Sequence, residues 1–137
     1  MSDDKNRHTD LYRIDDLAVD QGQRRVFRGD HEIKLPKLSF DLLLALVRAA
    51  PNSLSIDELI DRVWNGAVVS PATVSKRVEL LRHALGEDSE NARYVALVRG
   101  HGYRLIPQPK PIERGAESRD YRRLAVAGVV ALVLAVV

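Results

Sequence analysis

The pattern of apolar and polar residues divides the chain into a β-rich N-terminal part followed by three helices. Four short β-prone runs occupy residues 11–14, 17–19, 25–28 and 31–35. The gaps between them hold Asp-Asp, Gln-Gly and Gly-Asp pairs, which favour turns. Short strands separated in this way are typical of an antiparallel meander. We therefore predict a small antiparallel sheet at the N-terminal end of the fold.

Two helices follow the sheet. Residues 38–50 are apolar on nearly every side, which predicts a helix at the centre of a core. Ser55 and Glu58 have the Ser-x-x-Glu spacing of a capping box, in which each residue satisfies an amide of the other. The spacing of apolar residues after Ser55 predicts a second, amphipathic helix that stops by Gly66.

Residues 70–85 predict a third helix. Ser70 can accept the free amides of a first turn, Pro71 needs no amide there, and Gly86 marks the end. Its apolar residues recur at spacings of four, three and four, which makes one stripe to be buried: Val74, Val78, Leu81 and Leu85. Since residues 65–69 form a short connection to the second helix, the two helices together predict a helix-turn-helix.

The side of the third helix away from the apolar stripe carries hydroxyl and cationic groups. At about 100° per residue, Thr73, Lys76 and Leu80 lie on that side, with Arg77 on its flank and Arg82 nearer the core. Such groups can donate hydrogen bonds to phosphates and base edges in a major groove. The alternative is an ordinary solvated surface helix, and for Arg82 the alternative is a salt bridge at the edge of the core.

Residues 94–106 predict a β-hairpin with an arginine at its tip. Two β-prone runs flank Arg99, Gly100, His101 and Gly102, and the glycines can take the positive φ of a tight turn. The Gly-x-Gly spacing lacks the third glycine and the following helix of a nucleotide-binding loop. We expect the nearby Tyr103 to be a core aromatic residue.

The C-terminal part has a different composition. Residues 107–123 form a proline-rich, charged stretch that predicts an extended, unpacked linker. Residues 124–137 contain only Leu, Ala, Val and Gly, and as a helix they would be about 21 Å long, against about 30 Å for a bilayer core. We interpret them as the start of a truncated transmembrane helix. The alternative is an apolar C-terminal helix that docks on a core or a partner.

Composition and charge narrow the function. The net charge of +2 divides into −2 for residues 1–65 and +4 for residues 66–137, so the half with the third helix and the hairpin is the basic one. There are no cysteines, which excludes disulfides and thiolate metal sites. The four histidines are scattered, and no catalytic set or phosphate loop is present. We expect a binding protein with no catalytic residues, no cofactor and no metal, rather than a hydrolase or transferase.

Particular residues resemble the winged-helix effector domain of OmpR/PhoB-type response regulators. The resemblance covers residues 11–106. It rests on Phe40-Asp41-Leu42-Leu43, Glu58-Leu59, Val63-Trp64, Leu81-Arg82, Leu85-Gly86 and, most specifically, Val98-Arg99-Gly100-His101-Gly102-Tyr103-Arg104. It implies an α+β fold, a winged helix-turn-helix with an N-terminal antiparallel sheet, three helices and a C-terminal β-hairpin wing.

Two departures from that family refine the expectation. Only ten polar residues, 1–10, precede the first strand; we expect them to be a disordered arm, with no room for a receiver domain. The linker and the apolar run look instead like ToxR/CadC-type membrane-integrated regulators, with Arg119, Arg122 and Arg123 holding the folded domain on the cytoplasmic side of the inner membrane. The third helix also carries Ala72, Glu79 and Leu80 where relatives are often richer in arginine, so base preference does not transfer.

The resemblance implies a function and its residues. We expect a sequence-specific transcription regulator in which Thr73, Lys76, Arg77 and Arg82 enter or flank the major groove of double-stranded DNA. Arg99 would reach a minor groove from the wing. RNA polymerase and a second copy of the chain on DNA are further expected partners. The alternative is a winged helix tethered to the membrane as a protein–protein interaction module.

Overall fold

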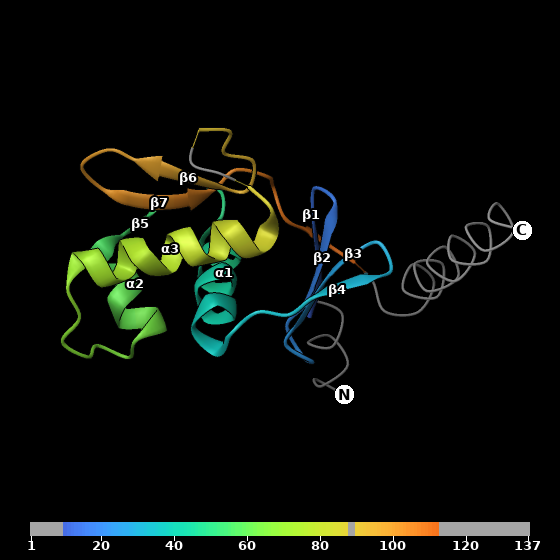
Figure 1. Ribbon diagram of the computed structural model, residues 1–137, viewed down its shortest axis with the longest axis horizontal. Coiled ribbons are helices and arrows are strands. Elements are labelled where there is room, and N and C mark those ends of the chain that lie inside the picture. The colour runs from blue at the N-terminus through green and yellow to red at the C-terminus, as the bar shows by residue number, and fades with distance from the viewer. Residues whose placement is uncertain (1–9, 88–89, 113–137) are drawn as a thin grey trace, which may run out of the picture. The chain divides into compact units, whose positions relative to one another are not determined.

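The computed structural model describes residues 10–87 and 90–112 (Figure 1). The described residues divide into two compact units. The first unit contains residues 10–33 and 110–112, and the second contains residues 34–109. Residues 1–9 of the expected arm at 1–10, residues 113–123 of the expected linker and the expected membrane segment at residues 124–137 lie outside the described residues.

The first unit is an antiparallel sheet with the strand order β4-β3-β2-β1-β8. Its strands are β1 (Leu11–Ile14), β2 (Leu17–Asp20), β3 (Arg25–Arg28), β4 (His31–Ile33) and β8 (Lys110–Pro111). Tyr12 pairs with Val19, and Val19 pairs in turn with Val26. Both valines are at most 1% exposed. The predicted N-terminal meander is confirmed with nearly the predicted boundaries.

Strand β8 was not predicted. Lys110 and Pro111 pair with Arg13 and Tyr12 of β1, and the amide of Ile112 donates to the Leu11 carbonyl at 2.7 Å. These residues lie in the stretch whose proline-rich, charged composition predicts an extended, unpacked linker. Since β8 is the outermost strand of the sheet, the missing amide of Pro111 costs it no pairing on the other side. Ordered structure therefore continues from residue 106 to Ile112.

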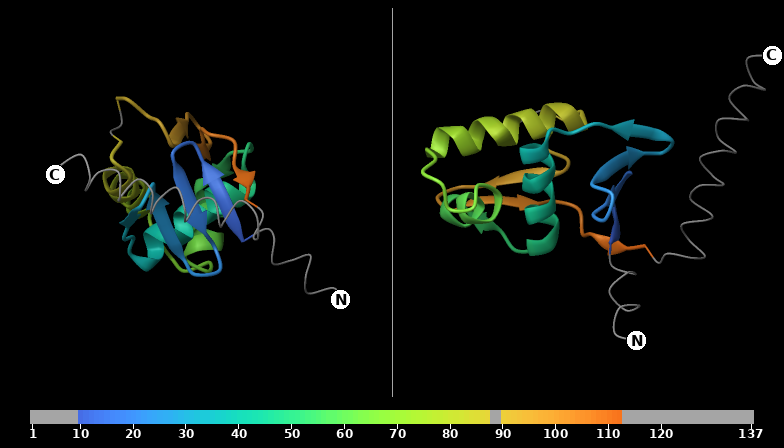
Figure 2. Two further views of the ribbon diagram at one scale, coloured as in Figure 1. Left: turned by 90° about the vertical axis from the view of Figure 1, so that its right-hand side faces the viewer. Right: turned by 90° about the horizontal axis from the view of Figure 1, so that it is seen from below.

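The second unit is built around helix α1 (Lys37–Ala49). All six residues from 42 to 47 are buried, as the continuous apolar sequence predicts for a central helix. Helix α1 contacts α2 (Ile56–Val63), α3 (Pro71–Leu85) and the hairpin strand β7 (Gly102–Leu105). Figure 2 (right) shows α3 running across the direction of α1. A central apolar helix thus supports the other elements of this unit.

Helix α2 begins with the predicted capping box. The Ser55 hydroxyl accepts from the Glu58 amide at 3.1 Å, and the Ser55 amide donates to the Glu58 carboxylate at 3.2 Å. Ser55 also belongs to β5 (Leu54–Ser55), a two-residue strand that the sequence analysis did not predict. It pairs with β7, which gives a second sheet with the order β5-β7-β6, where β6 is Val95–Val98. These strands and α1 to α3 complete the predicted winged helix-turn-helix.

No helix among residues 10–87 and 90–112 is long and apolar enough to cross a membrane.

Candidate nucleic-acid interface

Helix α3 has the ends that its sequence predicts. The Ser70 hydroxyl accepts from the Thr73 amide at 3.3 Å and lies 3.0 Å from the Thr73 hydroxyl. At the other end Gly86 has a φ of 81°, and the amides of Gly86 and Glu87 donate back to the carbonyls of His83 and Arg82. These two bonds form a Schellman motif, in which a left-handed glycine closes the helix. Both ends of α3 are therefore fixed by local hydrogen bonds.

The apolar stripe fixes which side of α3 faces outward. Val74, Val78, Leu81 and Leu85 are all fully buried. On the other side Thr73 and Lys76 are exposed, Leu80 is 42% exposed and Arg77 is half-buried. The outward face of α3 thus has the composition that its periodicity predicts.

Arg82 is placed differently from the other predicted DNA contacts. It is only 5% exposed, and one guanidinium nitrogen donates to the Val95 carbonyl of β6 at 3.0 Å. Other nitrogens lie 3.2 Å from the Glu79 carboxylate and 3.6 Å from the Glu87 carboxylate. This geometry fits the alternative of a salt bridge at the core edge. The expectation that Arg82 flanks the major groove does not fit its burial, because its guanidinium is covered and is bonded to the Val95 carbonyl.

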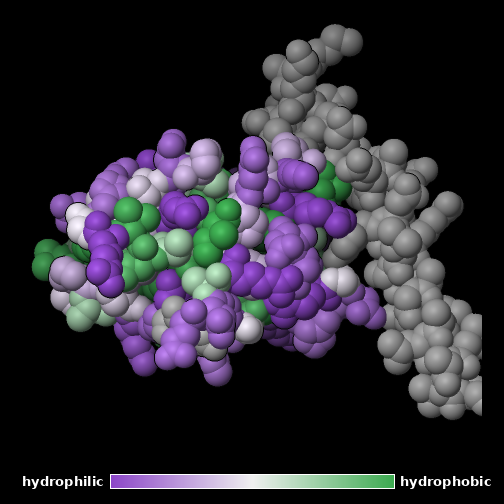
Figure 3. Space-filling model, turned by 90° about the horizontal axis from the view of Figure 1, so that it is seen from above, coloured by the Kyte–Doolittle hydropathy of each residue, from purple (hydrophilic) through white to green (hydrophobic). Residues whose placement is uncertain are grey.

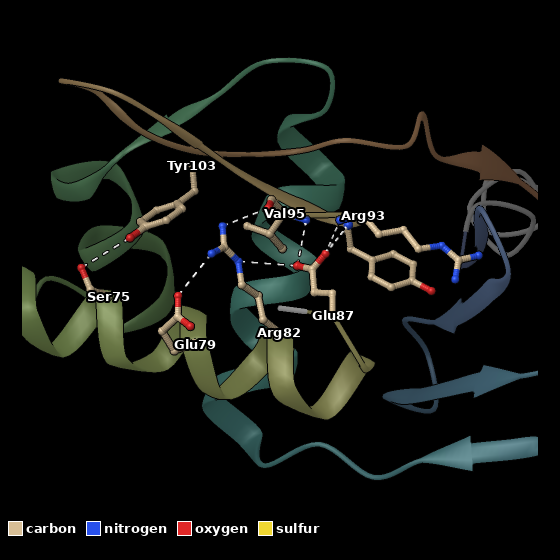
Figure 4. Close-up of polar contacts among 8 residues, drawn as sticks. Ser75, Glu79, Arg82, Glu87, Arg93, Val95 and Tyr103 are labelled. Carbon is tan, nitrogen blue, oxygen red and sulfur yellow. Dashed lines mark hydrogen bonds and ion pairs between the residues drawn. The ribbon is translucent and has the colours of Figure 1, made fainter. Parts of the chain in front are cut away.

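Glu87 is a buried acidic residue that the sequence analysis did not single out. Its side chain is 1% exposed, and its carboxylate accepts from the backbone amides of Arg93, Tyr94 and Val95 at 2.5, 2.6 and 3.2 Å (Figure 4). Together with Arg82 it joins the end of α3 to the start of β6. Its position directly after Gly86, in an acidic polar stretch, gave no periodic signal of burial.

A second polar contact connects α3 to the hairpin. The Tyr103 hydroxyl of β7 donates to the Ser75 hydroxyl of α3 at 3.4 Å, and Tyr103 is 7% exposed, as expected of a core aromatic residue (Figure 4). Contacts at Ser75 and at Arg82 hold the hairpin at two places along the helix. The position of the wing relative to α3 is therefore set by side chains as well as by the chain connection.

The hairpin turn places Arg99 at the tip of the wing. The His101 amide donates to the Val98 carbonyl at 3.0 Å, and Gly100 has a φ of 72°, as the third residue of a type II turn requires. Gly102 has a different role from the positive φ that we predicted for it. A Cβ on Gly102 would overlap the Leu54 carbonyl oxygen of β5, so glycine is needed there for close strand approach.

Three cationic side chains of α3 and the hairpin are available to a partner. Within residues 10–87 and 90–112, no hydrogen bond or ion pair engages the side chains of Lys76, Arg77 or Arg99. The hairpin loop and the N-terminal end of α3 lie at the same end of the unit in both Figure 1 and Figure 2. A negatively charged partner would meet donors from both elements there.

The first turn of α2 lies near the wing tip. The Ser55 amide, then the Ser55 hydroxyl, hold the pKa of Glu58 below its ordinary value, and the charges of Arg62 and His101 lower this pKa further. His101 is exposed, as are His31 and His83. Among the residues that the structure describes, no three His, Asp or Glu side chains are grouped to hold a metal ion.

Residues 30–105 match the family model described as "Transcriptional regulatory protein, C terminal". The chain belongs to this family. The match runs from the end of the first sheet through the hairpin wing and contains α1, α2 and α3. The resemblance to OmpR/PhoB-type winged-helix domains is thus confirmed, and the family is one of transcription regulators, not of enzymes.

Two curated relatives illustrate the similarity. The chain is 33% identical over 99 residues to the DNA-binding response regulator MtrA of Mycolicibacterium smegmatis. The matched region covers 72% of this chain and 43% of MtrA. It is 32% identical over 80 residues to the transcriptional regulator HilA of Salmonella typhimurium, and this matched region covers 58% of the chain and 14% of HilA. The chain thus spans less than half the length of these relatives.

Solved structures of other proteins share the fold of this chain. The DNA-binding domain of E. coli CadC superposes with a TM-score of 0.66 and 27% identity, covering 76% of this chain and 98% of that domain. DrrB of Thermotoga maritima, an OmpR/PhoB homologue, superposes with a TM-score of 0.67 and 29% identity, covering 74% of this chain and 46% of DrrB.

Proposed function

We propose that this regulator binds double-stranded DNA in a sequence-specific way, with α3 in the major groove and the wing at a minor groove. The observation that supports this proposal is a set of cations at one end of the second unit that have no partner among the described residues: Lys76 and Arg77 on α3 and Arg99 on the hairpin. The exposed Thr73 adds a hydroxyl to the same helix face. Arg82 is not included, because its guanidinium is engaged inside the protein.

The dimensions of the elements agree with this arrangement. A helix with side chains is about 10 to 12 Å across, and the major groove of B-DNA is about 12 Å wide. Lysine and arginine on the inserted helix can then donate to phosphates and to base-edge acceptors. A guanidinium at the wing tip suits the strong negative potential of a narrow minor groove.

The salt dependence of binding tests the proposal. If about five phosphates are neutralised, the logarithm of the association constant should fall with the logarithm of salt concentration with a slope of about −4 to −5. Lys76→Ala should reduce the magnitude of the slope by about one and weaken all duplexes similarly. Arg48→Ala, which removes an exposed cation from α1, is the matched control and should leave the slope unchanged. A slope near zero for the unmodified protein would refute DNA binding through these charges.

We propose further that the protein is anchored in the inner membrane, with its winged helix in the cytoplasm. The support is compositional: three arginines lie shortly before the apolar run of residues 124–137, namely Arg119, Arg122 and Arg123. Cationic residues beside an apolar segment favour the cytoplasmic side. The protein should fractionate with the inner membrane. Its winged helix should resist a protease added to the periplasmic side of spheroplasts. Digestion of the winged helix by that protease would contradict the topology. RNA polymerase and a second copy on DNA stay predictions.

A second candidate is a protein-interaction module at the membrane. It is favoured by apolar surface on the hairpin, where Leu97 is 59% exposed and Ile106 is 38% exposed. Figure 3 shows one face of the molecule on which apolar residues are interspersed among hydrophilic ones. The salt titration separates the two candidates, because a module of this kind needs no affinity for duplex DNA.

A further inference from the structure

Leu80 is an apolar residue on the outward face of an otherwise polar helix surface. It is 42% exposed, whereas the neighbouring Val78 and Leu81 are fully buried. Its side chain is therefore only partly covered by the core that Val74, Val78, Leu81 and Leu85 help to form. Leucine at this position calls for an explanation beyond the stability of the second unit.

The neighbours of Leu80 on this face are the proposed DNA-binding residues. Lys76 and Arg77 precede it by four and three residues, so they lie one helical turn away on the same side of α3. At about 100° per residue, Leu80 falls between the directions of Lys76 and Arg77, and Thr73 lies two turns away. The apolar side chain is thus at the centre of a cationic strip, which disfavours an apolar protein surface as its partner.

The major groove offers a partner that fits both properties. Phosphates on either side of the groove match the two cations, and the C5 methyl group of thymine is the apolar group that the base edges present. We propose that Leu80 is a specificity-determining residue that packs on a thymine methyl group and so selects an A·T base pair at that position. This inference rests on the proposed DNA binding, and it identifies what the centre of the α3 face reads.

Replacing thymine with uracil tests the contact, because this change removes only the methyl group. Preferred duplexes are first selected from a random library with the full chain, and each thymine in the selected site is then changed to uracil in turn. Removing the contacted methyl should weaken binding by the unmodified protein about fourfold, the effect of about one buried CH₂. The same change should have no effect on binding by Leu80→Ala.

Leu97→Ala is the matched control, because it removes an exposed leucine from the wing rather than from α3. This variant should lose about fourfold on uracil duplexes just as the unmodified protein does. Both variants should keep their unfolding midpoints, since surface substitutions usually change stability little.

The outcomes separate the two levels of the proposal. If the unmodified protein binds DNA but uracil costs Leu80→Ala as much as it costs the unmodified protein, or costs neither anything, Leu80 does not read a methyl group, while DNA binding stands. If the unmodified protein selects no duplex at all, the proposed function fails and the inference fails with it.

Discussion

Removing the Glu87 carboxylate should destabilise the second unit more than any surface change on α3. Glu87→Ala deletes three hydrogen bonds to the backbone before and within β6, and it deletes the buried acidic partner of Arg82. Arg82 is 5% exposed, so its charge would stay buried with less compensation. Glu87→Ala should therefore destabilise both the C-terminal end of α3 and the wing.

The size of the effect follows from these contacts. Three hydrogen bonds at about 1 kcal/mol each give a loss of about 3 kcal/mol, and breaking a buried ion pair costs about 3 to 5 kcal/mol. Because the contacts overlap, we expect a decrease of about 3 to 5 kcal/mol in the free energy of unfolding, out of a total of about 5 to 15 kcal/mol. Glu87→Gln, which keeps the shape and one acceptor oxygen, should cost less than Glu87→Ala.

Glu79→Gln is the matched control because Glu79 contacts the same arginine. Its carboxylate lies 3.2 Å from Arg82, but its side chain is 56% exposed. Because water reaches the Glu79 carboxylate, this contact should contribute about 0 to 1 kcal/mol, so the variant should remain close to the unmodified protein.

Urea denaturation of the full chain, followed by fluorescence of Trp64, measures these differences. Trp64 is the sole tryptophan of the chain and lies at the end of α2. A change of midpoint at constant slope reports stability alone. If Glu87→Ala costs no more than Glu79→Gln, the buried cluster does not stabilise the fold and our reasoning about it is wrong.

Three further predictions concern the wing and α2. Gly102→Ala should destabilise the second unit by about 2 to 3 kcal/mol in the same urea assay, because the new Cβ would overlap the backbone of Leu54. An unchanged midpoint would show that the close approach of β7 to β5 does not require glycine. Arg99→Ala should leave the unfolding midpoint nearly unchanged but weaken DNA binding by about 1 to 3 kcal/mol. The loss should be larger on binding sites flanked by A-tracts than on sites flanked by G·C pairs, and equal losses on both would mean that Arg99 contacts only phosphates. The pKa of Glu58 is lowered in the folded state, so its stabilising contribution is present above its ordinary pKa of 4.5 and is lost as the pH falls through the folded-state pKa. Glu58→Gln should therefore flatten this part of the curve of unfolding free energy measured from pH 5 to pH 2. An unaltered curve would argue against the cap.

The sequence by itself determined the elements whose signals are local. The spacing of Val74, Val78, Leu81 and Leu85 fixed the buried side of α3, and the spacing of Ser55 and Glu58 fixed the start of α2. These signals survive in the fold because helix caps and amphipathic stripes depend on residues a few positions apart. The outward positions of Thr73 and Lys76 followed directly from the same periodicity.

Only the tertiary structure decided the features that depend on residues far apart in the chain. Helical periodicity placed Arg82 near the core edge and left two roles open, and the Val95 carbonyl and the Glu87 carboxylate chose between them. Strands β5 and β8 contain two residues each, too few for a pattern, and exist because β7 and β1 offer them unpaired edges. Gly102 likewise shows its reason only when Leu54 is brought against it. Pairing partners and burial of charge are properties of the packed unit, which no local pattern encodes.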